Sequence, residues 1–404
     1  MVLKIKKNTT IGNIGSYYEI LHEHINSDSP LDLMLPQSLS NAYLGLIPSL
    51  YQLIITWIRY KNSGKLLLDI SNGEETEIVK IYENELIFPM VSMVWNRNGV
   101  YSKDGLTNLR AILRPHNVEM FNRMLKALPL KKGRKLLLTE FDHLDKSRGV
   151  LPCFEINNEF VKNEAALFSN LRQGLTEVVG YSADYKKVFD IIAKELNGII
   201  FELMKNTFEW GKTDQNNVEL DPSIRGAYFK LFKKRRTIVL DEFKDHLGLT
   251  DYFSDPMHKE NGVGEIGFIE ISVFDSGVGF VEKFKSLNNF TNLTDIEILK
   301  KCLIKHTTSA KGLDKDEKGI GLDRILNMLD TRGFMRIKTG KIDIYRNLIT
   351  QKYREVANAD FKSLELFDWK THSRDEFSEA LPAAGSLITV IFPLSIPFQH
   401  RLDL

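Results

Sequence analysis

The chain has few of the residues that mark disulfide-rich or metal-stapled folds. Among its 404 residues there are only two cysteines, Cys153 and Cys302, and they form no CxxC pair. A disulfide scaffold or a zinc module is therefore not expected, and a reducing cytoplasm suits the chain better. Charge of one sign is also lacking, because 54 basic and 53 acidic residues leave a net charge of +1. Nucleic-acid binding through bulk charge is not predicted.

Apolar segments of membrane length are lacking as well. The N-terminus has basic residues but no apolar core behind them, so no signal peptide is predicted. An uncharged stretch runs from Asn41 to Ile58, but it contains Pro48 and Gln52. It is short for a membrane span, which needs about 20 apolar residues. We expect a buried helix there and a cytoplasmic protein without a membrane segment.

The composition is that of a folded protein, with 43% hydrophobic and 26% charged residues. The first 160 residues alternate strand-like and helix-like runs, which is typical of an α/β domain. We expect a separate N-terminal α/β domain over residues 1–160, a sensor or partner-binding unit without a chemical motif. Its expected strands are Lys65–Ser71, Glu77–Tyr82 and Lys135–Thr139, and its expected helices are Asn41–Tyr60 and Asn117–Leu128.

The rest of the chain predicts a second α/β unit. Residues 161–182 read as a helical connector, and residues 183–404 as an α/β sandwich whose strands are packed on one side by helices. Polar insertions are expected at about 211–265 and 341–381. The expected helices are Ala183–Trp210 and Leu322–Asp330, and the expected strands are Phe268–Phe274, Phe334–Thr339 and Leu387–Phe392.

The long helix carries a polar stripe made of Glu195, Glu202, Asn206 and Glu209. Glu202 and Asn206 are four residues apart and therefore neighbours on the helix surface. A solvated helix face would explain such a stripe. Asparagine is a poor residue for a helix interior, however, and its carbonyl oxygen can bind Mg²⁺. A neighbouring carboxylate could then take a proton from a water molecule that attacks a phosphate.

Two glycine-bearing segments lie further along the chain. The strand over Phe268–Phe274 leads into Asp275-Ser-Gly-Val-Gly-Phe, in which Gly277 and Gly279 permit a close approach of a ligand to the backbone. Later, His306-Thr-Thr-Ser-Ala-Lys-Gly and Lys318-Gly-Ile-Gly-Leu enclose a short polar loop and lead into a helix. Glycines before a helix N-terminus can present free N–H groups to an anion. Each segment alone is equally consistent with an ordinary turn or a surface loop.

Taken in order, ExxxN on a helix, DxGxG after a strand, a Thr/Ser/Lys-rich segment and GxGL at a helix start resemble the GHKL superfamily with its Bergerat fold. This superfamily includes DNA gyrase, MutL, heat-shock chaperone ATPases, sensor histidine kinases and anti-sigma kinases. The resemblance is strongest over residues 183–335, and the strand within 385–393 looks like the family's closing strand. It covers a little over half of the chain.

The resemblance implies a site for ATP and Mg²⁺. Asn206 would ligate the Mg²⁺, and Asp275 would bind the adenine amine above a floor shaped by Gly277 and Gly279. Glu202 stands where gyrase-like members have their general base. Glu209 of the long helix is a further implied nucleotide contact, and so is Ser386, where many relatives have Thr. The remaining implied contacts are Thr307, Thr308, Ser309 and Lys311 of the lid and Lys318, Gly319, Gly321 and Leu322 at the helix start.

Three functions stay open at this level. The first is an Mg²⁺-dependent ATPase whose lid closes on ATP and switches contacts with a protein partner or a second subunit. The second is a kinase that phosphorylates Ser, Thr or His of a partner, although none of the nine histidines has the sequence context of a phosphoacceptor. The third is an adaptor that senses ATP or ADP without turnover. Bacterial signalling or defence would suit all three. The basic run 230–236 predicts either a solvated face or a docking surface for an acidic partner or nucleic acid.

Overall fold

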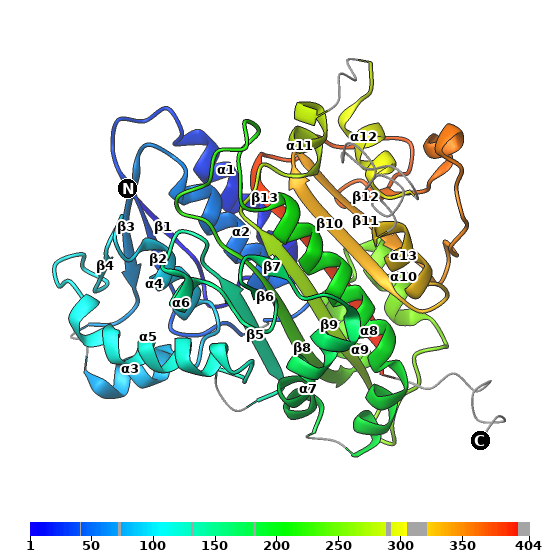
Figure 1. The fold of residues 1–404 in the computed structure, drawn as a ribbon, viewed down its shortest axis with the longest axis horizontal. Coiled ribbons are helices and arrows are strands. Elements are labelled where there is room, and N and C mark those ends of the chain that lie inside the picture. The colour runs from blue at the N-terminus through cyan, green and yellow to red at the C-terminus, as the bar shows by residue number, and fades with distance from the viewer. Residues whose placement is uncertain are drawn as a thin grey trace.

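The computed structural model describes residues 1–40, 42–71, 74–130, 133–180, 183–287, 292–304 and 321–394. These residues build a mixed α/β fold with one parallel and one antiparallel sheet (Figure 1). The parallel sheet has the order β1-β2-β3-β4. Its strands are β1 (Val2–Lys4), β2 (Leu31–Leu35), β3 (Ser63–Leu68) and β4 (Val100–Tyr101), and the helices around them are η1 (Ile11–Asn13), α1 (Gly15–Glu23), α2 (Leu46–Ile58), α3 (Glu75–Ile81), α4 (Ile87–Val94) and α5 (Arg110–Leu125).

The seven-stranded sheet has the order β12-β11-β10-β13-β9-β8-β5, and all its neighbouring strands are antiparallel. The strands are β5 (Lys135–Glu140), β8 (Arg225–Arg235), β9 (Glu265–Asp275), β10 (Phe334–Gly340), β11 (Ile342–Asn347), β12 (Phe367–Asp368) and β13 (Ala383–Pro393). The remaining elements are the hairpin β6 (Glu155–Ile156) and β7 (Glu159–Phe160) and the helices α6 (Lys146–Gly149), α7 (Glu164–Val179), α8 (Ala183–Trp210), α9 (Arg236–Glu242), α10 (Leu247–Ser254), α11 (Phe280–Leu287), α12 (Asp295–Cys302), α13 (Gly321–Met328) and η3 (Asn358–Ser363).

Helices cover both faces of the seven-stranded sheet, whereas the sequence predicted helices on one side. On one face, α8 packs against β9 and β8 and runs roughly along the strands, with α7 and α13 beside it (Figure 1). On the other face, α2 packs against β13 and β9. Side chains alternate between the two faces along a strand. In β9, Phe274 therefore meets Tyr51 of α2, with ring centroids 4.9 Å apart, while Asp275 faces the end of α8.

The uncharged stretch found in the sequence is the helix between the two sheets. Every residue of α2 is buried, as expected of a helix that is apolar on all sides. Trp57 Nε1 donates to the Leu31 carbonyl of the parallel sheet at 2.7 Å. Gln52 Nε2 donates to the Lys338 carbonyl of the antiparallel sheet at 3.1 Å. In the described part of the chain, no helix is both long and apolar enough to cross a membrane.

Two elements of the first 160 residues differ from the prediction. The expected strand Glu77–Tyr82 is part of helix α3, because Ile78 and Ile81, three residues apart, both turn into the core. The expected helix Asn117–Leu128 begins earlier, as α5, with Pro115 inside it. The strand expected at Lys135–Thr139 exists as β5, but it pairs with β8 at the edge of the seven-stranded sheet. One hydrophobic core joins both halves of the chain.

The stretch 211–265, where the sequence predicted a polar insertion, holds part of the sheet. It contains β8, which pairs along its full length with β9 inside the sheet. The pattern of β8 was hidden because Lys230, Lys233 and Lys234 interrupt its apolar residues. These cations are paired: Lys233 lies 2.9 Å from Glu265 and Lys234 lies 2.9 Å from Glu242, while Lys230 donates to the Ala42 carbonyl. The basic run is therefore largely neutralised within the fold.

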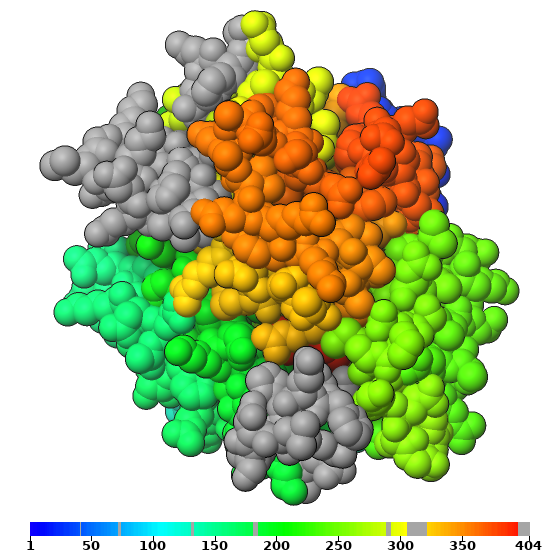
Figure 2. Space-filling model, turned by 90° about the vertical axis from the view of Figure 1, so that its right-hand side faces the viewer, coloured from blue at the N-terminus to red at the C-terminus, as the bar shows by residue number. Residues whose placement is uncertain are grey.

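The second predicted insertion, 341–381, also extends the sheet in part, because β11 pairs with β10 and β12 pairs with β11. Figure 2 shows the segment between β11 and β13, in orange, spread over the surface beside the light-green segment that holds α9 and α10. The other predicted elements, α8, β9, α13, β10 and β13, lie where the sequence placed them, with ends that differ by a few residues.

Candidate functional site

The turn after β9 is held by hydrogen bonds that the side chains of its first two residues accept. Asp275 Oδ1 accepts a hydrogen bond from the Gly277 N–H at 2.7 Å. The Ser276 hydroxyl accepts one from the Ile224 N–H at 2.9 Å, which ties the turn to the residue just before β8. Gly279 has a φ of 86°, a conformation that side chains other than glycine's rarely adopt. The DxGxG pattern therefore forms a defined turn with one carboxylate at its start.

The C-terminal end of α8 lies directly against this turn. A Cβ added to Gly211 would come within 2.7 Å of the Asp275 Cβ, and one added to Gly277 would come within 3.1 Å of the Trp210 carbonyl. Asn206 is one helical turn before Trp210 and is partly exposed. Glu209 belongs to the same last turn of the helix. The structure therefore brings the α8 end that carries Asn206 next to Asp275, although the two residues are far apart in sequence.

Strands β13 and β10 close the other side of the turn. Gly385 has a φ of 70°, and a Cβ there would overlap the Asp275 carbonyl oxygen. The hydroxyls of Ser386 and Thr339 lie 3.1 Å apart, and Thr339 Oγ1 also accepts from the Phe280 N–H at 3.1 Å. Thr339 was not predicted as a site residue. Its position at the end of an expected strand, level with Ser386, was the signal that could have indicated it.

Asp275 sits in a strongly desolvated position. Burial raises the pKa of its carboxyl to about 6, although the backbone N–H groups of Gly277 and Ser386 and the cations Arg59 and Arg225 oppose the shift. At neutral pH the group is thus mostly ionised and can accept hydrogen bonds, but it gains a proton in mild acid. A carboxylate in such a buried position can form strong hydrogen bonds, because water competes little there.

Arg59 reaches the turn from the opposite face of the sheet. It follows α2, and its Nη1 donates to the Gly277 carbonyl at 3.2 Å while Nη2 donates to the Ser276 carbonyl. Burial lowers the pKa of Arg59, and Asp275 partly offsets this. The sequence offered no chemical motif in residues 1–160, so this contact was missed. Only the packing of α2 on the sheet shows it.

Glu202 faces the start of α13. Its Oε1 accepts from Arg324 Nη1 at 2.9 Å, and Arg324 also pairs with Glu164 of α7. A Cβ on Gly321 would come within 2.6 Å of Glu202 Oε2, so the glycine lets the two helices approach closely. Leu322, the next residue, is buried. Glu202 therefore lies next to the helix start that the sequence predicted for phosphate binding. Its carboxylate already accepts a hydrogen bond from Arg324.

Several predicted site residues lie outside the described residues. They are Thr307, Thr308, Ser309, Lys311, Lys318 and Gly319.

Within the described ranges, no group of three or more His, Cys, Asp or Glu side chains is arranged to hold a metal ion. A divalent cation would need few protein ligands here, such as the Asn206 carbonyl oxygen, with phosphate oxygens and water completing its shell, as is usual for Mg²⁺. The chemistry open to the described groups is recognition of an amine by Asp275 and proton transfer by Glu202.

Comparison of the chain with protein-family models, with curated proteins and with solved structures finds no match in any of the three.

Proposed function

We propose that this protein binds ATP with Mg²⁺ in a GHKL-type site on the α8 face of the seven-stranded sheet. The observation that carries the proposal is the meeting of the α8 end, the turn at Asp275 and the start of β13. These are three of the segments on which the family resemblance rests. The helix start at Gly321 lies further along α8, beside Glu202.

The described residues suit the parts of such a ligand. Asp275 would accept the hydrogen bond of the adenine amine, and Gly277 and Gly279 let the turn beside it pack closely against the neighbouring backbone. Asn206, partly exposed one turn before the end of α8, would bind the magnesium ion. The start of α13 at Gly321 would face the phosphates with its free N–H groups. Bound magnesium would neutralise phosphate charge and so permit attack on the terminal phosphorus.

We further propose that the protein hydrolyses ATP, with Glu202 as the general base. Glu202 is four residues before Asn206 on the same helix face, so its carboxylate can reach a water molecule near the phosphates. Positioning and electrostatics would supply most of the rate enhancement. Lid closure would then switch contacts with a protein partner or a second copy of the chain. A cytoplasmic location agrees with the two free cysteines.

The ion pair between Glu202 and Arg324 favours a second candidate, an ATP- or ADP-sensing adaptor without turnover. The Glu202 oxygen that accepts from the Arg324 guanidinium at 2.9 Å is already engaged and is not free to bind an attacking water molecule. Hydrolysis would require Arg324 to release Glu202, for example when a partner binds.

Phosphate release tests the hydrolytic proposal. Wild type and Glu202→Ala are incubated with MgATP, and ATP binding by each is measured in parallel by calorimetry. We expect Glu202→Ala to bind ATP and to lose hydrolysis by roughly 100-fold or more, the scale of a lost general base. Glu195→Ala, on the same helix but paired with Arg332, is the matched control and should retain hydrolysis. Unchanged hydrolysis in Glu202→Ala would rule out this role, and ATP binding without phosphate release in wild type would support the adaptor.

A further inference from the structure

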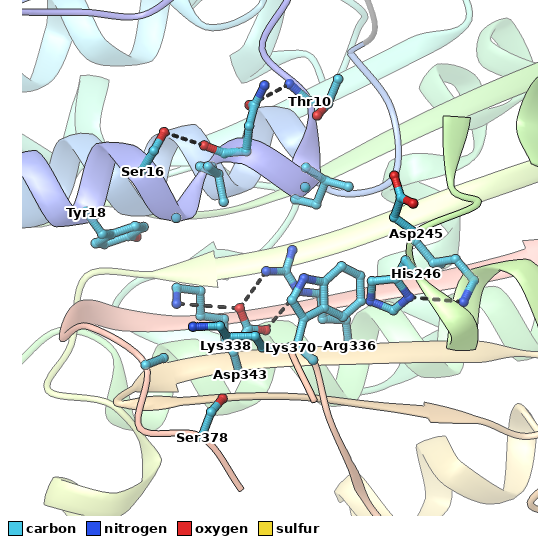
Figure 3. A pocket seen from close by; sticks show the side chains of 18 of the residues that line it. Thr10, Ser16, Tyr18, Asp245, His246, Arg336, Lys338, Asp343, Lys370 and Ser378 are labelled. Carbon is cyan, nitrogen blue, oxygen red and sulfur yellow. Dashed lines mark hydrogen bonds and ion pairs between the residues drawn. The ribbon is translucent and has the colours of Figure 1, made fainter. Parts of the chain in front are cut away.

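A cavity lies on the face of the seven-stranded sheet opposite to α8 (Figure 3). Its volume is about 690 Å³, within the range of small-molecule pockets. The strands β10 and β11 form its floor, and the segment 10–19 with the start of α1 lies across from them. The start of α10 and the loop 369–381 complete the wall. The proposed nucleotide-binding function makes no use of this cavity.

The floor holds more positive than negative charge. Arg336 and Asp343 form a bidentate ion pair, with Nε–Oδ1 at 2.9 Å and Nη2–Oδ2 at 2.7 Å. Lys338 lies 3.5 Å from the same carboxylate. All three line the cavity, and the side chains of Arg336 and Lys338 are 4% and 6% exposed. One carboxylate thus faces two buried cations.

Lys338 has unused hydrogen-bonding capacity. An ammonium group has three donors, and its one acceptor among the described residues is Asp343, at the long distance of 3.5 Å. Its other neighbour is the Tyr18 ring, whose centroid is 4.9 Å from Nζ. Burying a charged group with so few partners is costly. An anion in the cavity would supply the missing acceptors.

Across the cavity, the start of α1 adds backbone N–H groups as hydrogen-bond donors. Gly12, Asn13, Gly15 and Ser16 line the cavity there. The Ile14 N-cap of α1 provides no side-chain hydrogen bond to the first turn. N–H groups at a helix start attract negative charge. Figure 3 shows Ser16 and Thr10 on this side, with Lys338 and Asp343 on the opposite side.

The wall next to the charged floor is aromatic. The Trp369 ring lies 4.0 Å from the Arg336 guanidinium and 4.0 Å from the His246 ring. His246 Nδ1 accepts from the Leu249 N–H at 3.2 Å, so a neutral ring carries its proton on Nε2. That buried Nε2 has no hydrogen-bond partner among the described residues. Burial, together with His372 and Arg336, lowers the pKa of His246 to about 3, so the ring stays neutral and can act as a donor.

Exposed side chains of both signs also line the cavity. Glu19, Asp245 and Glu379 are exposed carboxylates, Glu379 is paired with Lys341, and Lys370 is an exposed cation. The volume of the cavity restricts a ligand to a small molecule. The cation surplus on the floor and the Trp369 ring together match an anionic group attached to a flat or apolar body.

We propose that this cavity binds a small organic anion, a carboxylate or a phosphate monoester on an aromatic or apolar body, with Lys338 as its main anion contact. Benzoate and phenyl phosphate serve as probes, because they share a ring and differ only in the anionic group. Benzyl alcohol is the neutral counterpart. Dissociation constants are measured by ligand-observed saturation-transfer NMR with the full-length protein.

The variants are Lys338→Met, Asn206→Ala and Lys362→Met. Lys338→Met leaves Asp343 paired with Arg336, so the fold should persist, and thermal unfolding checks this. Asn206 lies on the opposite face of the sheet, and Lys362 is a surface lysine, 68% exposed. We expect at least one anionic probe to bind wild type in preference to benzyl alcohol. Lys338→Met should raise its dissociation constant by about 10-fold or more, the scale of a lost charge-assisted hydrogen bond. The other two variants should leave it unchanged.

The two anionic probes separate the sources, because preference for benzoate indicates a carboxylate ligand and preference for phenyl phosphate indicates a phosphate ester. Failure of both to bind wild type at millimolar concentration overturns the proposal, and so does equal binding by Lys338→Met. A loss in Asn206→Ala alone would assign the anions to the nucleotide site instead. If Lys338→Met does not fold, Trp369→Leu replaces it, with a several-fold weaker binding of the ring probes expected and unchanged binding contradicting the proposal.

Discussion

At Gly385, another atom already occupies the place that a Cβ would take. Its φ is 70°, and an added Cβ would overlap the Asp275 carbonyl oxygen. Gly340 has a similar φ of 54°, but nothing lies within 4 Å of an added Cβ. Gly340→Ala should therefore lower the free energy of unfolding by roughly 1–2 kcal/mol, the cost of a left-handed backbone. Gly385→Ala should lower it by about 3 kcal/mol or more, because a clash is added. Urea unfolding measures both, and equal losses would show that the turn is not tightly packed there.

A single residue, Glu270, also makes the stability of the fold depend on pH. It is fully buried in β9, and burial raises the pKa of its carboxyl from 4.5 to about 7 despite nearby Lys230. The folded state therefore binds the proton more tightly than the unfolded state. Its contribution to stability is fully present below pH 4.5 and is lost as the pH rises through 7. At about 1.4 kcal/mol per pKa unit, the loss amounts to at most roughly 3–4 kcal/mol.

Urea unfolding at pH 5 and pH 8 tests this. Glu140, whose pKa burial also raises to about 7, contributes in the same direction, whereas His246, whose pKa burial lowers to about 3, contributes in the opposite direction. Compared with wild type, Glu270→Gln should therefore lose less stability, or gain more, between pH 5 and pH 8. Glu282→Gln, at an exposed site, should behave like wild type. The assignment to Glu270 is wrong if its variant and wild type lose equal stability between the two pH values.

At the scale of elements, α2 links the N-terminal half to the turn after β9. Arg59 holds the Ser276 and Gly277 carbonyls and adds positive charge near Asp275. Arg59→Ala should loosen the turn and raise the pKa of Asp275, so the dissociation constant for MgATP should increase by about 10-fold. Arg97→Ala removes a comparable bond, at 2.7 Å, to the Asp221 carbonyl on the surface and should leave it unchanged. Calorimetry compares the two variants, and equal affinities would mean that Arg59 does not support the site.

The elements also show what sequence patterns could and could not predict. The end of β9 was readable because Ile269, Ile271 and Val273 alternate cleanly before Asp275. Strand β8 was not, since its lysines break the apolar pattern and their acidic partners come from elsewhere in the chain. Arg59 and the ion pair between Glu202 and Arg324 depend on how helices pack across the sheet. Helical periodicity alone does not determine such contacts.

At the scale of the whole molecule, the two halves share one core. Helix α2 is buried between the two sheets, and β5 from the first half pairs with β8 from the second. We therefore expect the full chain to unfold in one cooperative transition. Intrinsic tryptophan fluorescence follows the four tryptophans, Trp57 and Trp95 in the first half and Trp210 and Trp369 in the second. Far-ultraviolet circular dichroism follows the whole fold. The midpoints of the two signals should coincide in urea. Two separate transitions would instead support the independent N-terminal domain that the sequence predicted.

Calorimetric titration of MgATP into wild type and Asp275→Asn is the most direct test of the nucleotide site. The amide keeps the size of the buried side chain but removes the charge that would bind the adenine amine. Wild type should bind ATP in a magnesium-dependent manner, and Asp275→Asn should bind it about 10- to 100-fold more weakly. Asp190→Asn, on the exposed side of α8, should bind like wild type. Absence of binding by wild type, or equal affinity in Asp275→Asn, would contradict a nucleotide site at this turn.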